Sequence, residues 1–325
     1  MEERVEAKPV STLRRLVPYA ATLVIPVIVG AFLATYFSDW HFENHPLHAL
    51  AEGLGAFIAI SIAALIFALR NSKAIAPEFI WVSGALLSMG IFDGLHAALH
   101  VGELFVWLHS LATFAGGVIF MMIWSGYVPK SEAEYTTIIG SILCLTIAVS
   151  GWSLIYPASV PLMVEGGEFT LAAEILNIGG GIGFLAGGLY LARQSFEGAE
   201  IFGHHCMLLA IAGLLFETSI LWDANWWFWH VLRAIAYGVA GLFFFKLFLD
   251  ALSQRAEAVQ RVTDFAESSS DWFWEQDEKL RFTFVSAANA DTSGLKPEDH
   301  YGLTRRESGI EGVSEVEWAA HEAAL

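Results

Sequence analysis

Long apolar runs alternate with short polar connections over the first 249 residues of the chain. A helix that crosses the hydrocarbon core of a membrane needs about 20 mostly apolar residues. Eight runs meet this requirement, and they cover residues 15–37, 47–69, 77–100, 105–127, 135–156, 171–192, 203–222 and 227–249. The pattern predicts an all-α polytopic membrane protein, with an N-terminal segment at 1–14 and an eight-helix transmembrane bundle at 15–249. The first run is followed by no small-residue cleavage motif, so we interpret it as a retained anchor.

Composition supports a membrane protein and excludes two other classes. The 325 residues are 55% hydrophobic and only 16% charged, and the mean hydropathy is +0.54. Soluble domains carry about 25% charged residues, so an ordinary cytosolic enzyme does not fit. The net charge of −17 argues against nucleic acid as a partner. Cys144 and Cys206 both lie in apolar runs, so neither a disulfide framework nor a thiolate metal site is expected.

Apart from Arg233, which lies inside the last run, the basic residues of the membrane part follow every second connection. They lie before the first run, between runs 2 and 3, 4 and 5, and 6 and 7, and at the end of run 8, whereas the other four connections contain none. Cytoplasmic loops carry the excess of Lys and Arg, so both termini are predicted to be cytoplasmic. The tryptophans gather at the predicted outer ends of the runs, as in an aromatic belt: Trp40, Trp107, Trp152, Trp222, Trp226, Trp227 and Trp229.

Ionisable residues occur at one depth of these apolar runs, within about 10 Å of the predicted outer side at 1.5 Å per residue. Such residues are costly in a membrane and are commonly functional. Seven of them are candidate metal ligands: His48, Glu52, Asp93, His96, His100, His109 and His230. Four others are candidates for supporting the ligands or contacting a bound molecule: Arg233, Glu217, Tyr237 and Glu174. A buried polar network without metal is the alternative interpretation.

Imidazole and carboxylate groups suit transition metals, and we favour copper or iron, with zinc as a further possibility. Ligand pairs three or four residues apart on separate helices are typical of metal sites in helical bundles. His41 and His45 precede the second run and are candidates for metal capture at the surface. Haem is a weaker alternative, because nothing identifies an axial pair. A buried guanidinium needs a carboxylate, so Arg233 is expected to pair with Glu217 or Asp93.

A glycine-rich run, residues 179–188, follows no predicted strand and carries no lysine, so it is not a phosphate-binding loop. Gly179, Gly183 and Gly187 recur every four residues. This spacing is typical of a helix face that a neighbouring helix approaches closely.

Apolar residues recur at three- and four-residue steps after the last run, in a linker at residues 250–268. The series starts at Phe248, at the end of the last run, and continues in the linker with Leu252, Ala256, Val259, Val262 and Ala266. This spacing is that of a parallel coiled-coil seam and predicts a homodimer, with a single linker helix as the alternative. No helix breaker separates the linker from the last run, so one continuous helix of about 60 Å is expected over residues 227–266.

The C-terminal segment, residues 269–325, switches to strand periodicity. Two alternating runs, 273–277 and 280–286, flank an acidic turn and predict a hairpin. Residues 271–307 resemble the first part of a PAS domain, with a strand, a D-x-x-x-R turn, a second strand, a helical segment and a Gly-Leu-x-Pro-Glu-Asp step. The resemblance implies a truncated α/β PAS domain whose later strands are missing, and hence a chain that belongs to a longer protein.

The membrane part resembles the MASE group of bacterial membrane-associated sensor domains in residues 48–67, 79–100 and 228–245. The unusual number of histidines departs from that pattern. The resemblance implies a multi-pass input module of the bacterial inner membrane, embedded in lipid, while the depth of the candidate ligands places the expected metal site near the periplasmic face. It also implies an output domain beyond this chain, either a histidine kinase or a GGDEF/EAL diguanylate cyclase or phosphodiesterase.

These features predict a signal-transducing sensor that responds to a metal, a gas or a small redox-active ligand through the continuous helix. No catalytic residue is predicted in this chain. One alternative is an intramembrane metal-dependent hydrolase of the ceramidase-like type, although a hydrolase needs no signalling helix. A haem-binding redox membrane protein is another. A transporter would need polar residues through the whole membrane, and here most of them stop in the outer half.

Overall fold

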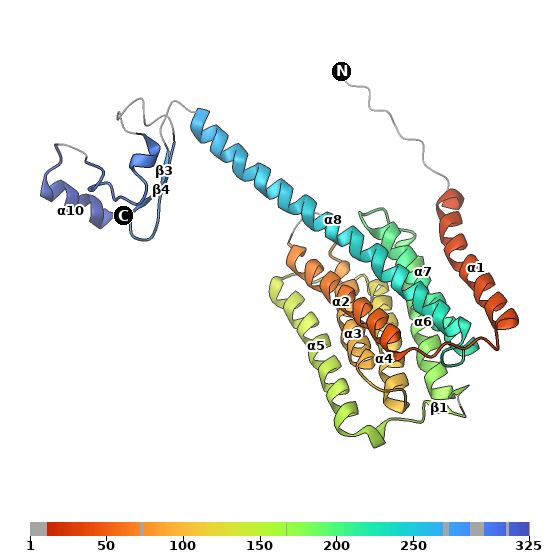
Figure 1. Cartoon of the computed structure of the whole chain (residues 1–325). Coiled ribbons are helices and arrows are strands. Elements are labelled where there is room, and N and C mark those ends of the chain that lie inside the picture. The colour runs from red at the N-terminus through yellow and green to blue at the C-terminus, as the bar shows by residue number, and fades with distance from the viewer. Residues whose placement is uncertain are drawn as a thin grey trace. The chain divides into compact units, whose positions relative to one another are not determined.

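The computed structural model describes residues 12–71, 75–166, 168–268, 273–286, 296–309 and 312–324. The chain divides into two compact units, Met1–Phe248 and Leu249–Leu325. Within the described residues, eight helices are long and apolar enough to cross a membrane. They are α1 (Thr12–Tyr36), α2 (His45–Leu69), α3 (Phe79–Ala97), α4 (Glu103–Met121), α5 (Glu132–Ile155), α6 (Leu171–Leu191), α7 (Ala199–Leu215) and α8 (Ala224–Ser268). The predicted eight-helix architecture is therefore confirmed (Figure 1).

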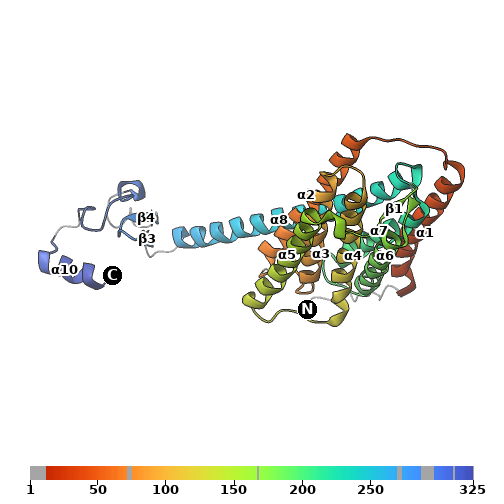
Figure 2. The same cartoon turned by 90° about the horizontal axis from the view of Figure 1, so that it is seen from below.

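The helices of the first unit pack as a bundle in which α2, α3, α4, α6 and α7 are successive neighbours. Helix α5 packs on α3 and α1 packs on α7, so α5 and α1 lie at opposite edges (Figures 1 and 2). Burial follows this order: 72% of the span is buried in α3 and in α7, against 22% in α5 and 17% in α1. The apolar outer faces of α1 and α5 are consistent with contact with lipid.

Glycines allow α4 and α6 to approach closely. A Cβ atom added to Gly117 would lie 2.1 Å from the carbonyl oxygen of Gly180, and one added to Gly180 would lie 2.3 Å from that of Thr113. A Cβ on Gly183 would likewise meet the backbone of Gly117, at 2.5 Å. The predicted close approach is confirmed. Its register differs from the expectation, because Gly179 faces the ring of Phe114 and Gly180 takes the place at the backbone contact.

Short segments between the helices close the end of the bundle at which α1, α3, α5 and α7 terminate. They include the helical turns η2 (Pro157–Ser159) and η3 (Phe216–Thr218), and the paired strands β1 (Val164–Glu165) and β2 (Glu168–Phe169). The helical turn η1 (Met122–Ser125) follows α4 and lies at the opposite end.

Polar contacts fix the starts of α2 and α8 at this end of the bundle. Asn44 caps α2 by accepting a hydrogen bond from the Leu47 amide at 3.0 Å. Asp223 caps α8 through the Trp226 amide at 2.6 Å and also forms an isolated β-bridge with His41. These contacts hold the starts of α2 and α8 in place, and the candidate ligands His48 and His230 lie in the first turn of α2 and the second turn of α8.

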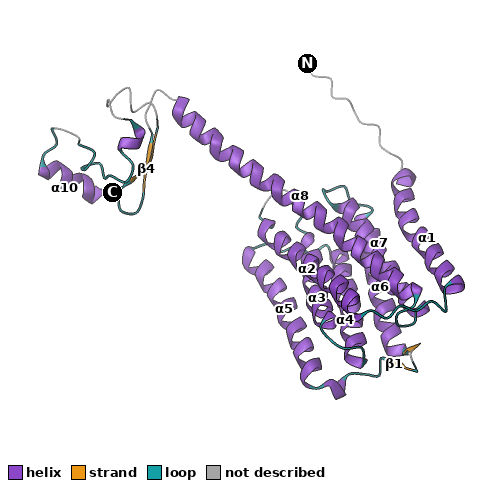
Figure 3. Cartoon of the chain, viewed as in Figure 1, coloured by secondary structure: helices purple, strands orange, loops and turns teal. Residues whose placement is uncertain are grey.

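Helix α8 runs for 45 residues without interruption, which confirms the predicted continuous helix. In the second unit, β3 (Trp274–Gln276) pairs antiparallel with β4 (Phe282–Val285), as the predicted hairpin requires (Figure 3). The Asp277 carboxylate accepts hydrogen bonds from the Arg281 and Lys279 amides, both at 2.9 Å, and these bonds lower the pKa of Asp277. The unit also contains η4 (Pro297–Asp299) and α10 (Glu315–Ala324). The helical segment expected just after β4 falls largely on residues 287–295, outside the described residues.

Candidate metal centre

Four helices bring buried imidazole, carboxylate and guanidinium groups together inside the bundle. Helix α2 contributes two of these side chains, α3 two, α4 one and α8 two, and each residue is at most 5% exposed. They are His48 and Glu52, Asp93 and His96, His109, and His230 and Arg233. On α2, α3 and α8 the paired residues are three or four positions apart, so both side chains of each pair lie on one helical face. We call these seven residues the histidine cluster.

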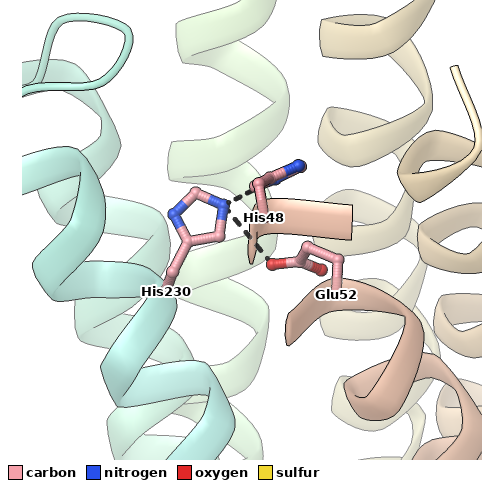
Figure 4. Close-up of side chains that lie close together, drawn as sticks. All are labelled: His48, Glu52 and His230. Atoms are coloured by element: carbon pink, nitrogen blue, oxygen red, sulfur yellow. Dashed lines mark hydrogen bonds and ion pairs between the residues drawn. The ribbon is translucent and has the colours of Figure 1, made fainter. Parts of the chain in front are cut away.

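One part of the histidine cluster has the geometry of a metal-binding group. Ligand atoms of His48, Glu52 and His230 all lie within 4.8 Å of one another (Figure 4). His48 Nε2 lies 3.2 Å from His230 Nε2, and His230 Nε2 lies 3.4 Å from Glu52 Oε1. Two imidazole nitrogens bound at 2.0–2.1 Å to one tetrahedral metal lie about 3.3 Å apart. The observed spacing is therefore suited to a shared metal ion.

Backbone contacts indicate which nitrogens carry the lone pairs. His230 Nδ1 lies 2.7 Å from the Trp226 carbonyl oxygen, and His96 Nδ1 lies 2.6 Å from that of Phe105. A carbonyl oxygen only accepts, so each Nδ1 carries the hydrogen and each Nε2 of the neutral ring carries a lone pair. Both Nε2 atoms face His48 Nε2, at 3.2 and 3.4 Å. A single N–H on His48 Nε2 can donate a hydrogen bond to only one of these two nitrogens, whereas one metal ion can bind several nitrogen lone pairs.

A second group, Glu52, Asp93 and His109, also has its ligand atoms within 4.8 Å. The Arg233 guanidinium lies in this group. It forms a short hydrogen-bonded ion pair with Asp93, as the sequence analysis expected, and lies 3.6 Å from Glu52 Oε2. Tyr237 donates to the same Asp93 carboxylate at 3.3 Å. Because the buried Arg233 cation already compensates the Asp93 carboxylate, the group around His48 and His230, which does not include Asp93, is the better metal candidate.

Tryptophans enclose the candidate ligands. The His230 ring stacks on Trp229 with centroids 3.7 Å apart, and Trp226 lies at 3.9 Å. The sequence analysis assigned Trp222, Trp226 and Trp229 to a membrane-surface belt, but all three are at most 4% exposed. They pack around the histidine cluster instead, because the first turns of α8 face the bundle interior. They keep bulk water away from the ligands.

Several predicted site residues lie away from the histidine cluster. Helix α3 ends at Ala97, so His100 leaves the helical face that carries Asp93 and His96, and it is exposed. Glu217 lies exposed in η3 and does not pair with Arg233. Glu174 is half-buried near the start of α6. His41 and His45 are both exposed, and His45 Nε2 contacts Glu43 at 2.9 Å.

Sequence reasoning missed two kinds of participant. Thr113 accepts a hydrogen bond from Arg233 Nη1 at 3.3 Å. Its position four residues after His109, on the same helical face, was an available signal. The backbone carbonyl oxygens of Phe105 and Trp226 orient two of the imidazoles. Every residue has such a carbonyl, so residue type could not identify them.

The described residues therefore contain a buried group of two histidines and a glutamate that could hold a metal ion. Comparison of the chain with protein-family models, with curated proteins and with solved structures finds no match. A proposal for the function therefore depends on the chemistry of the histidine cluster.

Proposed function

We propose that this chain is the membrane-integrated sensor part of a bacterial signalling protein, with a transition-metal site in the histidine cluster. One observation carries the proposal: His230 and Arg233 belong to the same uninterrupted helix, α8, that continues to Ser268. A change at the metal site therefore acts directly on the element that leaves the bundle.

The proposed ligands are His48, Glu52 and His230, and His96 lies beside them, with its Nε2 3.4 Å from His48 Nε2. With both carboxylates ionised and the imidazoles neutral, Glu52, Asp93 and Arg233 together carry one net negative charge. A monovalent cation neutralises this charge, and uncompensated charge is costly inside a membrane. This balance favours copper(I), while iron(II) suits the same nitrogen and oxygen ligands.

Metal binding would link α2 and α8, because the ligands lie on these two helices. In the proposed orientation both termini are cytoplasmic in the bacterial inner membrane, and the metal site lies toward the periplasm. Helix α8 then carries the change to the PAS-like hairpin and onward to an output domain, a histidine kinase or a diguanylate cyclase or phosphodiesterase. A homodimer through residues 250–268 would place two such helices side by side.

The test compares metal loading with the response of α8. The full chain is purified in detergent and loaded with copper(I), and bound metal is measured by mass spectrometry after desalting. We expect about one ion per chain, and more than about 100-fold weaker binding in His230→Ala, because a direct ligand matters more than an outer partner. A spin label at Val259→Cys, with both native cysteines replaced by serine, reports whether loading alters α8.

His100→Ala is the matched control, since His100 is exposed and outside the histidine cluster. It should load like the wild type and should leave the label spectrum responsive to metal. Absence of copper and iron binding in the wild type would refute the metal site. Loading without any change at the label would refute transmission through α8.

The same ligand set offers a second candidate function. Two histidines and one glutamate are also the ligands of several zinc hydrolases, in which zinc activates water. Turnover of lipid amides by the zinc-loaded chain would favour this candidate. Haem is not supported, because the cavity that borders the described cluster measures about 10 Å³, far too little for a macrocycle.

A further inference from the structure

A small cavity borders the proposed metal site. It measures about 10 Å³, close to the room that one water-sized sphere needs. Three imidazoles line it, those of His96, His109 and His230, together with apolar side chains that include Phe216 and Leu221. His230 also belongs to the group of three proposed metal ligands. The cavity thus touches the metal site through a shared ligand.

The walls of the cavity select the chemistry of an occupant. Most lining side chains are aromatic or aliphatic, and apolar cavities disfavour ions and strongly hydrated molecules. With room for about one water-sized sphere, the cavity admits only the smallest molecules. A neutral diatomic gas meets both conditions, because it is small, weakly hydrated and soluble in the membrane.

The metal site supplies the means of holding such a gas. His48, Glu52 and His230 are three protein ligands, and sites with three protein ligands keep a position open for an exogenous one. A copper(I) or iron(II) ion held by these residues would supply a position at which carbon monoxide, nitric oxide or dioxygen could bind as an added ligand. No bond of the gas breaks on binding, so no oxidant or reductant is needed.

We propose that this cavity is the binding site for a diatomic gas, which coordinates to the open position of the metal held by His48, Glu52 and His230. The inference rests on the proposed function, which it deepens by naming the class of ligand that is sensed. Gas binding in the cavity adds a ligand to the metal beside His230 and so acts on α8.

Carbon monoxide is the probe, because the infrared stretch of bound carbon monoxide is diagnostic of coordination to copper(I) or iron(II). The full chain, loaded anaerobically with copper(I) and separately with iron(II), is titrated with the gas while metal content is measured in parallel. The expected result is saturable binding of one carbon monoxide per metal, with no signal in metal-free protein.

Leu221→Trp and the milder Leu221→Phe fill the cavity from the connection between α7 and α8. Both should retain metal and bind carbon monoxide at least 10-fold more weakly. Leu171→Trp is the matched control, because Leu171 is 68% exposed, and it should behave like the wild type.

The outcomes separate the two proposals. Wild-type protein that takes up neither metal refutes the proposed metal site, and the gas site with it. Metal uptake without any carbon monoxide signal overturns the gas site alone. Undiminished gas binding in both Leu221 variants places the gas outside this cavity and overturns the assignment.

Discussion

The Arg233 guanidinium is 3% exposed and lies between two carboxylates, those of Asp93 and Glu52. The guanidinium also donates a hydrogen bond to Thr113, so the cation is bound both by α3, through Asp93, and by α4. Removing one partner of a buried ion pair costs about 3–5 kcal/mol, because the other charge stays buried without compensation. Arg233 therefore has a structural role in addition to any part in sensing.

We expect Arg233→Met to lower the free energy of unfolding by about 3–5 kcal/mol. The reason is the buried charge left on Asp93 and Glu52, and Asp93→Asn in the same chain should restore part of the loss. Unfolding of the detergent-purified protein, followed by tryptophan fluorescence, measures the effect. Arg255→Met, at an exposed position of α8, is the control. Equal stability of the two single variants would contradict the role assigned to the buried guanidinium.

The candidate site was visible in the sequence as far as residue type and helical spacing reach. His48 and Glu52 are four residues apart within an apolar run, so both their presence and their shared face could be predicted. His100 could not be separated from His96, because this depends on where α3 ends. The exclusion of Glu217 likewise depends on the short η3 turn, which hydropathy does not detect.

Helices α4 and α6 are in close backbone contact. The contact depends on residues that lack a side chain, since a Cβ at Gly117 would overlap the carbonyl oxygen of Gly180. Helix α4 also carries His109 and Thr113, so its distance from α6 helps to set the position of the histidine cluster.

Gly117→Ala should destabilise the bundle by about 1–3 kcal/mol, the usual cost of overpacking. Gly140→Ala on α5 is the matched control, because a Cβ there meets nothing within 4 Å. It should be neutral or slightly stabilising, since alanine favours the helix. Thermal unfolding of both variants in one detergent makes the comparison. A Gly117→Ala protein as stable as the control would show that the two helices separate at no cost.

The elements themselves followed from the sequence more closely than the site did. All eight membrane helices could be predicted from the length and hydropathy of the apolar runs, and the β3–β4 hairpin from the alternation of apolar and polar residues. The two-residue strands β1 and β2 could not, since Gly166 and its neighbours carry no alternating pattern. On α6, Gly183 makes the predicted backbone contact with α4, but Gly180 takes the place expected for Gly179, because four-residue spacing alone does not fix which neighbouring glycine faces α4.

At the scale of the whole molecule, apolar side chains remain exposed along the part of α8 that belongs to the second unit. Leu252, Val259 and Val262 are 48%, 61% and 70% exposed. They recur at the spacing of a coiled-coil seam, which would bury them against a second copy of the chain.

Cysteine cross-linking in membranes tests this seam. We expect Val259→Cys, with Cys144 and Cys206 replaced by serine, to form an intermolecular disulfide on mild oxidation. The two copies of a seam residue lie close together in a parallel dimer. Arg261→Cys faces away from the seam and should cross-link far less. Equal cross-linking of both variants would indicate random collision and would contradict the dimer.

The continuity of α8 has a mechanical consequence. The stretch from His230 to Ser268 measures about 57 Å at 1.5 Å per residue. A tilt of this helix by about one degree around His230 would displace its far end by about 1 Å, the scale of interface helix shifts in switching proteins. Helix α8 can thus act as a lever, whose gain comes from its length rather than from any rearrangement of the buried ligands.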